Sequence, residues 1–475
     1  MRTLFLNPPS FEGFDGGAGS RWPSTREIES YWYPVWLCYP AGMLEDSKVL
    51  DAPPHGVSIE QTVAQANNFE LLVLFTSSPG FHVDVKIAEM MKDSNPKLKV
   101  AFVGPPVTIE PDKVLNASKA IDFIARREFD HPIANFAKGA ALEDLPGVSY
   151  RKNGANVHNP EGGYIENLDE LPWVSKVYKR DLDFRRYNVP FLLNPYVSFY
   201  TTRGCPAMCT FCLWPQTHSG HRWRLRSSDD IVNECRYVLE NFPGLKEIFF
   251  DDDTFTDDAL RAETIARGLG TLGVTWSCNA KANVSYETLK VLRDNGLRLL
   301  LVGYESGNQQ ILNNIKKGIR LDIARRFTRD CRTLGITIHG TFILGLPGET
   351  RETIQQTIDY AREINPHTIQ VSIAAPYPGT YLYEQARSNG WLLDDEGAES
   401  LVDERGVQTS ALSYPHLNRT EIFDSVETFY KRFYFRAGKI AELSGEMLRS
   451  PQMMKRRLRE GAEFVQFLTR RRQPA

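Results

Sequence analysis

Short apolar segments alternate with amphipathic stretches through the middle of this 475-residue chain, and this alternation constrains the fold more than any other feature. Each apolar segment has the length of a β-strand, and the stretches between them carry apolar residues at helical spacing. Alternating strands and helices build a parallel sheet covered by helices. Six such units predict an α/β fold with a partial (β/α)6 barrel over residues 196–400. The predicted strands are 197–202, 246–251, 273–278, 298–303, 336–344 and 368–373.

The first part of the chain shows the same alternation of predicted strands and helices over fewer residues. Strands are predicted at 3–6, 71–75 and 100–104, with a helix over 83–92 between the last two. This pattern predicts a Rossmann-like domain over residues 1–135, in which ligands bind beyond the carboxyl ends of the strands.

Residues 136–195 are rich in Asn, Gly, Pro and charged side chains. The pair Asn153-Gly154 predicts the turn of a small hairpin. We interpret this segment as a linker between the two α/β domains.

The pattern becomes helical and polar over residues 401–475. The last 45 residues carry 12 Lys and Arg against 4 Asp and Glu, and Phe464, Phe467 and Leu468 precede the arginines at 470–472. Two interpretations stay open: this basic tail contacts an anionic membrane surface, or it is a solvated terminal helix.

Composition excludes several classes of protein. The 56 Lys and Arg against 59 Asp and Glu argue against a surface built for nucleic acid. No apolar stretch approaches the roughly 20 residues that cross a bilayer. The apolar run at residues 3–6 is too short for a signal peptide. We therefore expect a cytoplasmic protein, with at most a peripheral contact with the inner membrane.

Three of the seven cysteines, Cys205, Cys209 and Cys212, crowd into eight residues just beyond the first predicted barrel strand. Three thiolates on one short loop can hold three corners of a cubane iron–sulfur cluster and leave the fourth iron open to a ligand. The alternative is a structural zinc ion, which needs a fourth ligand such as His218 or His221. The other four cysteines are interpreted as buried small apolar residues.

The spacing C-x3-C-x-aromatic-C, with Phe211 as the aromatic residue, resembles the signature of the radical S-adenosylmethionine (SAM) enzymes. This resemblance implies a [4Fe-4S] cluster on the three cysteines and SAM as a second cofactor. In that chemistry the reduced cluster passes one electron to SAM and yields a 5'-deoxyadenosyl radical. The electron then comes from a donor of the flavodoxin or ferredoxin type.

Further segments resemble the SAM-binding strand ends of this family. The resemblance implies that Asp251 and Asp252 contact the SAM amino group and that Glu305 faces the ribose or methionine. It places Gly345 and Leu346 against the adenine, and Lys281 within reach of a carboxylate. The alternative for the acidic pair is a solvated turn that opens a helix. No residue is assigned a catalytic proton or hydrogen transfer.

The N-terminal domain resembles the cobalamin-binding domain that is fused to many radical SAM enzymes. Asn7-Pro8-Pro9 and Val103-Gly104-Pro105-Pro106 carry this resemblance, so Pro9, Gly104 and Pro105 are the implied cobalamin contacts. The family variant with an axial histidine has D-x-H-x-x-G, whereas this chain has Asp51 four residues before His55. We therefore interpret His55 as a loop histidine.

Arg126-Arg127-Glu128, residues 251–255 and the aromatic stretch at 31–36 resemble the radical SAM proteins of bacterial hopanoid biosynthesis. This resemblance implies a lipid or lipid-linked sugar as substrate and the ring contraction of bacteriohopanetetrol glucosamine to the cyclitol ether. Two alternatives stay open. One is cobalamin-dependent radical C-methylation, and the other is a non-catalytic iron–sulfur or zinc protein.

Overall fold

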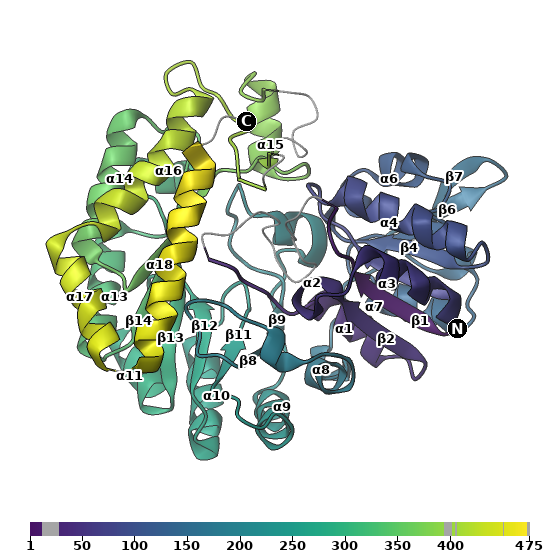
Figure 1. Ribbon diagram of the computed structural model, residues 1–475, viewed down its shortest axis with the longest axis horizontal. Coiled ribbons are helices and arrows are strands. Elements are labelled where there is room, and N and C mark those ends of the chain that lie inside the picture. Colours follow the sequence, from purple (N-terminus) through teal and green to yellow (C-terminus); the bar gives the residue numbers. More distant parts are fainter. Residues whose placement is uncertain (12–27, 394–400, 404–405, 450, 473–475) are drawn as a thin grey trace.

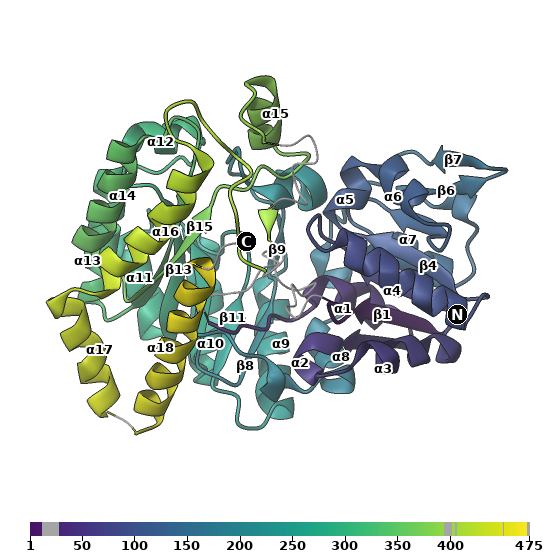
Figure 2. The ribbon, with the colours of Figure 1, turned by 45° about the horizontal axis from the view of Figure 1, so that its top comes forward.

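The computed structural model describes residues 1–11, 28–393, 401–403, 406–449 and 451–472. Two α/β units lie side by side in both views, with the N-terminal unit at the right and a larger half-barrel at the left and centre (Figures 1 and 2). Helices near the C-terminus cover the far flank of the half-barrel. The predicted fold class is confirmed.

The N-terminal unit is built on a seven-stranded sheet of order β2-β1-β3-β4-β5-β6-β7. Its first five strands are parallel, and the apolar side chains of β1, β3, β4 and β5 are buried on both faces. Strands β2 and β5 were not predicted, because β2 is a half-exposed edge strand and β5 has only three residues. These five strands are β1 (Thr3–Asn7), β2 (Ser47–Asp51), β3 (Leu71–Phe75), β4 (Lys99–Val103) and β5 (Phe123–Ala125).

The segment predicted as a linker belongs in part to this sheet. Strands β6 (Val148–Lys152) and β7 (Ala155–His158) form a hairpin, and β6 pairs antiparallel with β5. Asn153 and Gly154 have φ angles of 53° and 83°, as a two-residue hairpin turn of the primed type requires. The N-terminal unit therefore extends beyond residue 135, to His158.

The second unit is an open half-barrel of six parallel strands in chain order, which confirms the predicted partial barrel. All six predicted strands are present, with shifts of a few residues at their ends. The strands are β8 (Tyr196–Phe199), β11 (Glu247–Phe250), β12 (Trp276–Ala280), β13 (Leu297–Glu305), β14 (Thr337–Leu344) and β15 (Thr368–Ile373). Helices α9 (Ser228–Asn241), α10 (Ala259–Leu272), α11 (Tyr286–Asp294), α13 (Leu321–Thr333) and α14 (Arg351–Ile364) alternate with them.

The lumen of the half-barrel is open. On β14, Thr341 and Ile343 are half-exposed, whereas Phe342 and Leu344 between and after them are buried. Strand β15 repeats this alternation, with Gln370 half-exposed beside buried neighbours. Because alternate side chains face opposite sides of a sheet, one face packs on the helices and the other lines accessible space.

The last strand of the half-barrel is protected by side chains from the C-terminal region. The backbone N–H groups of Ile369 and Val371 donate to the hydroxyl oxygens of Tyr434 and Tyr430, at 3.0 and 2.9 Å. Both tyrosines lie on α16 (Arg419–Tyr434). An exposed strand edge would pair with other chains, so this cover keeps the half-barrel from doing so.

Helices α17 (Ala437–Arg449) and α18 (Pro451–Arg472) complete the C-terminal region. Phe467 and Leu468 are buried in the main core, and a guanidinium N–H of Arg471 donates to the carbonyl of Phe423 at 2.7 Å. Phe467 and Leu468, for which either a membrane contact or a solvated helix was expected, thus pack against the protein's own half-barrel. Within the described ranges, no helix has the length and apolar character needed to span a bilayer.

Candidate active site

The three cysteines lie in a loop at the carboxyl end of β8. The two-residue strand β9 (Thr202–Arg203) follows β8, so the loop starts at the edge where parallel strands place their ligand-binding ends. Cys205 and Cys209 are buried, with 7% and 8% of their surface exposed, and Cys212 is half-buried. The loop is thus at the end of the barrel strand that its sequence position indicates.

Two side chains that follow the cysteines hold the backbone of this loop. The side-chain amide of Gln216 donates to the carbonyls of Cys209 and Cys212, at 3.3 and 2.7 Å. Ring atom Nδ1 of His221 lies 3.1 Å from the carbonyl oxygen of Cys205. These contacts satisfy the loop carbonyls within the protein, so the polypeptide itself sets the shape of the loop.

Two lysines lie close to the thiols. Burial raises the pKa of Cys205 to about 11; Asp253 also raises it, and Lys281 lowers it. Burial raises the pKa of Cys209 as well; Lys317 and Lys281 lower it, and Glu305 raises it. Cysteine binds metals as the thiolate, and nearby ammonium groups favour that anionic form. The charges around the loop therefore fit a cluster held by three thiolates.

A structural zinc ion fits this region poorly. Zinc gathers four ligands around one ion, so the three cysteines would need a fourth ligand close by. The ring of His218 sits in an aromatic cluster, 4.7 Å from that of Trp36 and 5.3 Å from that of Trp214. His221 is committed to the loop backbone. Each thiolate of an iron–sulfur cluster binds a different iron, so the cysteines fit a cluster better.

The predicted acidic pair divides into two different environments. The carboxylate of Asp252 accepts four hydrogen bonds, from the backbone N–H and hydroxyl groups of Thr201 and Thr202, at 2.7 to 2.9 Å. It is fully engaged in shaping the turn before the cysteines. Asp251 accepts from the Tyr200 hydroxyl at 3.2 Å and from the Asn279 amide at 3.1 Å. A contact of Asp251 with SAM stays a prediction, and Asp252 is placed as a structural residue.

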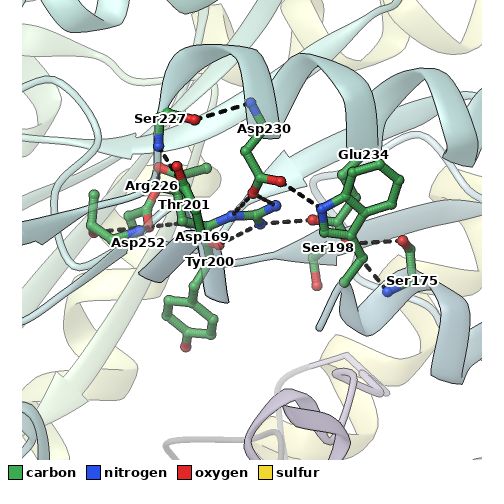
Figure 3. A network of polar contacts seen from close by, with 12 residues as sticks. Asp169, Ser175, Ser198, Tyr200, Thr201, Arg226, Ser227, Asp230, Glu234 and Asp252 are labelled. Atoms are coloured by element: carbon green, nitrogen blue, oxygen red, sulfur yellow. Dashed lines mark hydrogen bonds and ion pairs between the residues drawn. The ribbon is translucent and has the colours of Figure 1, made fainter. Parts of the chain in front are cut away.

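A network of buried charges holds the carboxyl end of β8 in place (Figure 3). Arg226 pairs with Asp230 at 2.5 Å and with Glu234 at 2.7 Å, and it donates to the carbonyl of Tyr200 at 3.2 Å. Glu234 also accepts from the Ser175 hydroxyl at 2.7 Å. Because buried charges are costly unless they are paired, this network holds the strand end in one position.

Glu305 ends β13 and pairs with a lysine that the sequence did not single out. Lys317 Nζ lies 2.5 Å from Glu305 Oε1. A β-carbon at Gly303 would collide with both groups, so glycine leaves the room that this pair occupies. Burial lowers the pKa of Lys317, but Glu305, Cys209 and Cys212 raise it more, and the net shift is upward. Lys317 therefore links the predicted SAM contact Glu305 to the cysteine loop.

The other predicted SAM contacts lie at the same end of the barrel. The backbone N–H groups of Gly345 and Leu346 donate to the carboxylate of Glu349, at 2.6 and 3.2 Å. These donors are used within the turn after β14, so contact with adenine stays a prediction. Lys281 forms an ion pair with Asp257 at 2.6 Å. The half-buried ring of Phe211 packs at the edge of the main core.

The predicted cobalamin contacts lie at the carboxyl edge of the N-terminal sheet. Pro9 follows β1, and Gly104 and Pro105 connect β4 to α5 (Pro105–Ile109); all three are buried. Gly104 has a φ of 115°, and a β-carbon there would collide with the carbonyl of Thr76. The order β2-β1-β3 places the switch point between β1 and β3, where nucleotide-like cofactors bind. This edge fits a cofactor bound beyond the strands.

His55 is a structural residue of its loop. Its Nδ1 lies 2.7 Å from the carbonyl oxygen of Asp51, and its Nε2 accepts the backbone N–H of Asp183 at 3.0 Å. Both ring nitrogens are therefore engaged, in agreement with the interpretation of His55 as a loop histidine.

Buried ion pairs lock the two units together at their ligand-binding edges. Arg203, directly before the cysteine loop, donates to both carboxylate oxygens of Asp130 at 2.8 and 3.0 Å. Arg224 does the same to Glu128 at 2.7 and 2.8 Å. Helix α5 packs against the π-helix η5 (Pro215–Ser219), which follows the cysteines. The cobalamin edge and the cysteine loop thus meet at one interface.

Sequence reasoning missed Gln216 and Lys317, and it considered His221 only as a possible zinc ligand. They act on the cysteine loop across a turn or from a separate β/α loop, and no motif marks them. The only signal is the run Lys316-Lys317-Gly318 after a helix, which places two cations in a predicted β/α loop.

Comparisons with known proteins agree with this geometry. Residues 199–361 match the Radical SAM superfamily, and residues 22–137 match the B12 binding domain. A protein of Pyrococcus horikoshii described as an uncharacterized methyltransferase is 29% identical over 405 residues, which span 83% of this chain and 84% of its own. The hopanoid C-3 methylase of Methylococcus capsulatus is 28% identical over 256 residues, 52% of this chain and 46% of its own.

A solved structure has the same fold. The radical SAM methyltransferase TsrM from Kitasatospora setae, with cobalamin and a [4Fe-4S] cluster bound, superposes with a TM-score of 0.69 at 16% identity and covers 90% of each chain. The likenesses to the Pyrococcus horikoshii protein and to TsrM each span both units rather than the half-barrel alone. The chain therefore belongs to the B12-binding radical SAM superfamily, as an enzyme whose cofactors are a [4Fe-4S] cluster, S-adenosylmethionine and cobalamin.

Proposed function

We propose that this enzyme is a cobalamin-dependent radical SAM methyltransferase that adds a methyl group to a carbon atom of its substrate. The observation that carries the proposal is the locked interface between the two cofactor-binding edges. The Arg203–Asp130 ion pair is buried and bidentate, and it sits one residue before the cysteine loop. A methyl carrier has to lie beside the SAM site, whereas a vestigial domain needs no such contact. The similarity to the Pyrococcus horikoshii methyltransferase also supports this reaction.

The polypeptide positions the cofactors and shields the reaction from water. When bound, the cluster and SAM supply a carbon-centred radical, and cobalamin supplies the methyl group. Gln216 and His221 hold the loop carbonyls, and Lys317 keeps positive charge beside the thiolates. The stacked rings of Trp36 and Trp214, 5.1 Å apart and buried, exclude water from the interface between the units.

A second candidate is ring contraction of a hopanoid-linked sugar to the cyclitol ether, which the sequence resemblance implies. The similarity to hopanoid C-3 methylase over about half of the chain supports a hopanoid substrate for either reaction. The two candidates differ in the fate of SAM. Both reactions yield 5'-deoxyadenosine and methionine from SAM, and methyl transfer yields S-adenosylhomocysteine in addition.

The test is anaerobic turnover of the reconstituted enzyme with SAM, a flavodoxin-type reductant and bacterial lipid extract. We expect S-adenosylhomocysteine to rise in proportion to a product that is one methylene unit heavier than its precursor. The matched control is Cys212→Ala, which should form neither 5'-deoxyadenosine nor product. Product formation with 5'-deoxyadenosine and without S-adenosylhomocysteine would replace methyl transfer with ring contraction.

A further inference from the structure

An apolar pocket lies away from the cysteine loop, at the amino-terminal end of the last barrel strands. It has a volume of about 380 Å³, within the range of small-molecule sites, and it is enclosed by β15, the three C-terminal helices and two extended segments near residues 30 and 190. The backbone N–H of Glu29 donates to Glu463 on α18 at 3.2 Å, which ties the first of these segments to the helices. Figures 1 and 2 show α18 running along this flank of the half-barrel.

The walls of the pocket are mostly apolar, with the ion pair of Arg457 and Glu460 (2.9 Å) on the side of α18, and its inner end is polar. Rings of Phe464 and Tyr430, 5.3 Å apart, form part of the wall. At the inner end, His339 and Gln370 reach the pocket from the strands. The indole N–H of Trp32 is buried at this pocket and has no hydrogen-bond partner among the residues that the structure describes. A ligand with an apolar body and an oxygen atom matches this lining, because the oxygen satisfies the indole N–H.

The rim of the pocket continues into an exposed apolar surface. Six of the fourteen large apolar side chains that are exposed in the described chain fall between residues 435 and 465, far above their share of the sequence. Three of them, Met454, Leu458 and Val465, recur along α18 at the spacing of one helix face. Val465 is 58% exposed and also lines the pocket, so the apolar surface leads directly into it.

Basic side chains flank this apolar surface. Lys455 and Arg459 are exposed next to Met454 and Leu458, and the last 45 residues carry 12 Lys and Arg against 4 Asp and Glu. A helix with an apolar stripe between cations matches an anionic bilayer surface. An apolar ligand that leaves such a bilayer would meet the open rim of the pocket first.

The distance between the pocket and the cofactors sets the length of the ligand. His339 lies five residues before Leu344, the last residue of β14. At about 3.3 Å per residue, the pocket is therefore roughly 16 Å from the edge that carries the cysteine loop. The open lumen runs between the two ends, because the inward-facing residues Thr341 and Ile343 are half-exposed. A molecule that fills the pocket and presents a carbon atom to the cofactors is elongated.

We propose that this pocket binds the apolar body of an elongated membrane lipid that carries an oxygen function, and that the lipid is the substrate. The assignment of the lipid as the substrate rests on the proposed function, whereas the lipid-binding site itself does not. Peripheral contact of α18 with the anionic membrane delivers the lipid to the rim.

The test measures lipid binding to the holoenzyme without turnover. The probes are tritium-labelled cholesterol and tritium-labelled 1-octadecanol, offered in vesicles of phosphatidylcholine with phosphatidylglycerol and, separately, in detergent micelles. Gly461 lines the pocket, and a β-carbon there meets no atom within 4 Å, so Gly461→Trp fills the pocket without a backbone clash. Gly438→Trp is the matched control, because Gly438 is equally open but lies outside the pocket.

We expect at least one probe to bind at one molecule per chain, and Gly461→Trp to weaken that binding by about tenfold or more. Trp32→Phe removes the indole N–H but keeps an aromatic ring, and it should weaken binding by a few-fold. Gly438→Trp should bind as the wild type does. Binding from vesicles but not from micelles supports delivery from the bilayer, and equal binding from both overturns that step.

The pocket assignment is wrong if neither probe binds, or if Gly461→Trp and Gly438→Trp retain equal affinity while both variants melt at the wild-type temperature. This result is independent of the turnover assay. If a probe binds but the turnover assay with lipid extract forms no S-adenosylhomocysteine, the methyl-transfer proposal fails while the lipid-binding site stands.

Discussion

Lys317 Nζ lies 2.5 Å from Glu305 Oε1, and the same ammonium group lowers the pKa of the Cys209 thiol. One side chain thus joins the end of β13 to the cysteine loop at the end of β8, two segments about a hundred residues apart in the chain. This contact makes the cluster site a product of the whole half-barrel rather than of the cysteine loop alone.

The first prediction concerns this lysine. Lys317→Met leaves the Glu305 carboxylate buried without its cation, which costs about 3–5 kcal/mol when a buried pair is broken. It also raises the pKa of Cys209, so iron should enter the loop more slowly at neutral pH. Chemical denaturation and the rate of cluster reconstitution measure both effects. The neighbouring exposed lysine offers a control, Lys316→Met, which should behave as the wild type in both assays.

The second prediction concerns the amide that holds the cysteine loop. Gln216→Leu removes the donor to the carbonyls of Cys209 and Cys212 and leaves these groups without that partner, at a cost of about 1–3 kcal/mol. We expect less iron per chain after reconstitution and an unchanged far-ultraviolet circular dichroism spectrum. Gln310→Leu, on an exposed helical position, is the control. Equal iron content in both variants would show that the loop does not depend on Gln216.

The third prediction is a pH dependence. Burial raises the pKa of Glu349 to about 8, above an ordinary value near 4.5. The folded state therefore holds a proton that the unfolded state has lost, and stability falls as pH rises from about 4.5 to 8, by up to about 1.4 kcal/mol per pH unit. Below this window the contribution is fully present.

Glu349→Gln keeps an oxygen acceptor for Gly345 and Leu346 but cannot ionise. Urea unfolding at pH 5, 6.5 and 8 should show that this variant loses less stability at high pH than the wild type. Glu352→Gln, at a solvent-exposed carboxylate three residues on, should leave the wild-type slope unchanged. If the free energy of unfolding falls equally with pH in the wild type and in Glu349→Gln, the raised pKa of Glu349 is contradicted.

The fourth prediction concerns the cobalamin edge. Gly104→Ala places a β-carbon against the Thr76 carbonyl at a positive φ, so the turn between β4 and α5 has to move. We expect the purified protein to lose the visible absorption of bound cobalamin. Gly56→Ala also lies at a positive φ, 64°, but its β-carbon meets no atom within 4 Å, so it should cost only about 1 kcal/mol and retain cobalamin. Retention of cobalamin by both variants would place the cofactor elsewhere.

Sequence patterns predicted those parts of the protein that are encoded by residues close together in the chain. The half-barrel strands are short apolar runs, and the cysteine spacing is a local motif, so both could be located in the chain. Strand β5 was missed because three residues carry no periodicity. The role of Asp252 was not predictable, since it depends on how Thr201 and Thr202 turn toward its carboxylate.

The tail illustrates a different limit. An amphipathic basic helix looks the same in sequence whether it packs on a membrane or on its own domain. In the structure, Phe467 and Leu468 are buried, while Leu458 and Val465 on another face are exposed. Only the position of the half-barrel decides which apolar stripe is covered.

The most direct test of the account is the metal content and the electron paramagnetic resonance spectrum of the anaerobically reconstituted protein, reduced with and without SAM. We predict about four iron and four sulfide per chain, lost together in Cys205→Ala, Cys209→Ala and Cys212→Ala. SAM should change the spectrum of the reduced cluster, because it binds the iron that has no protein ligand. Zinc without iron, or a spectrum that SAM leaves unchanged, would contradict the account.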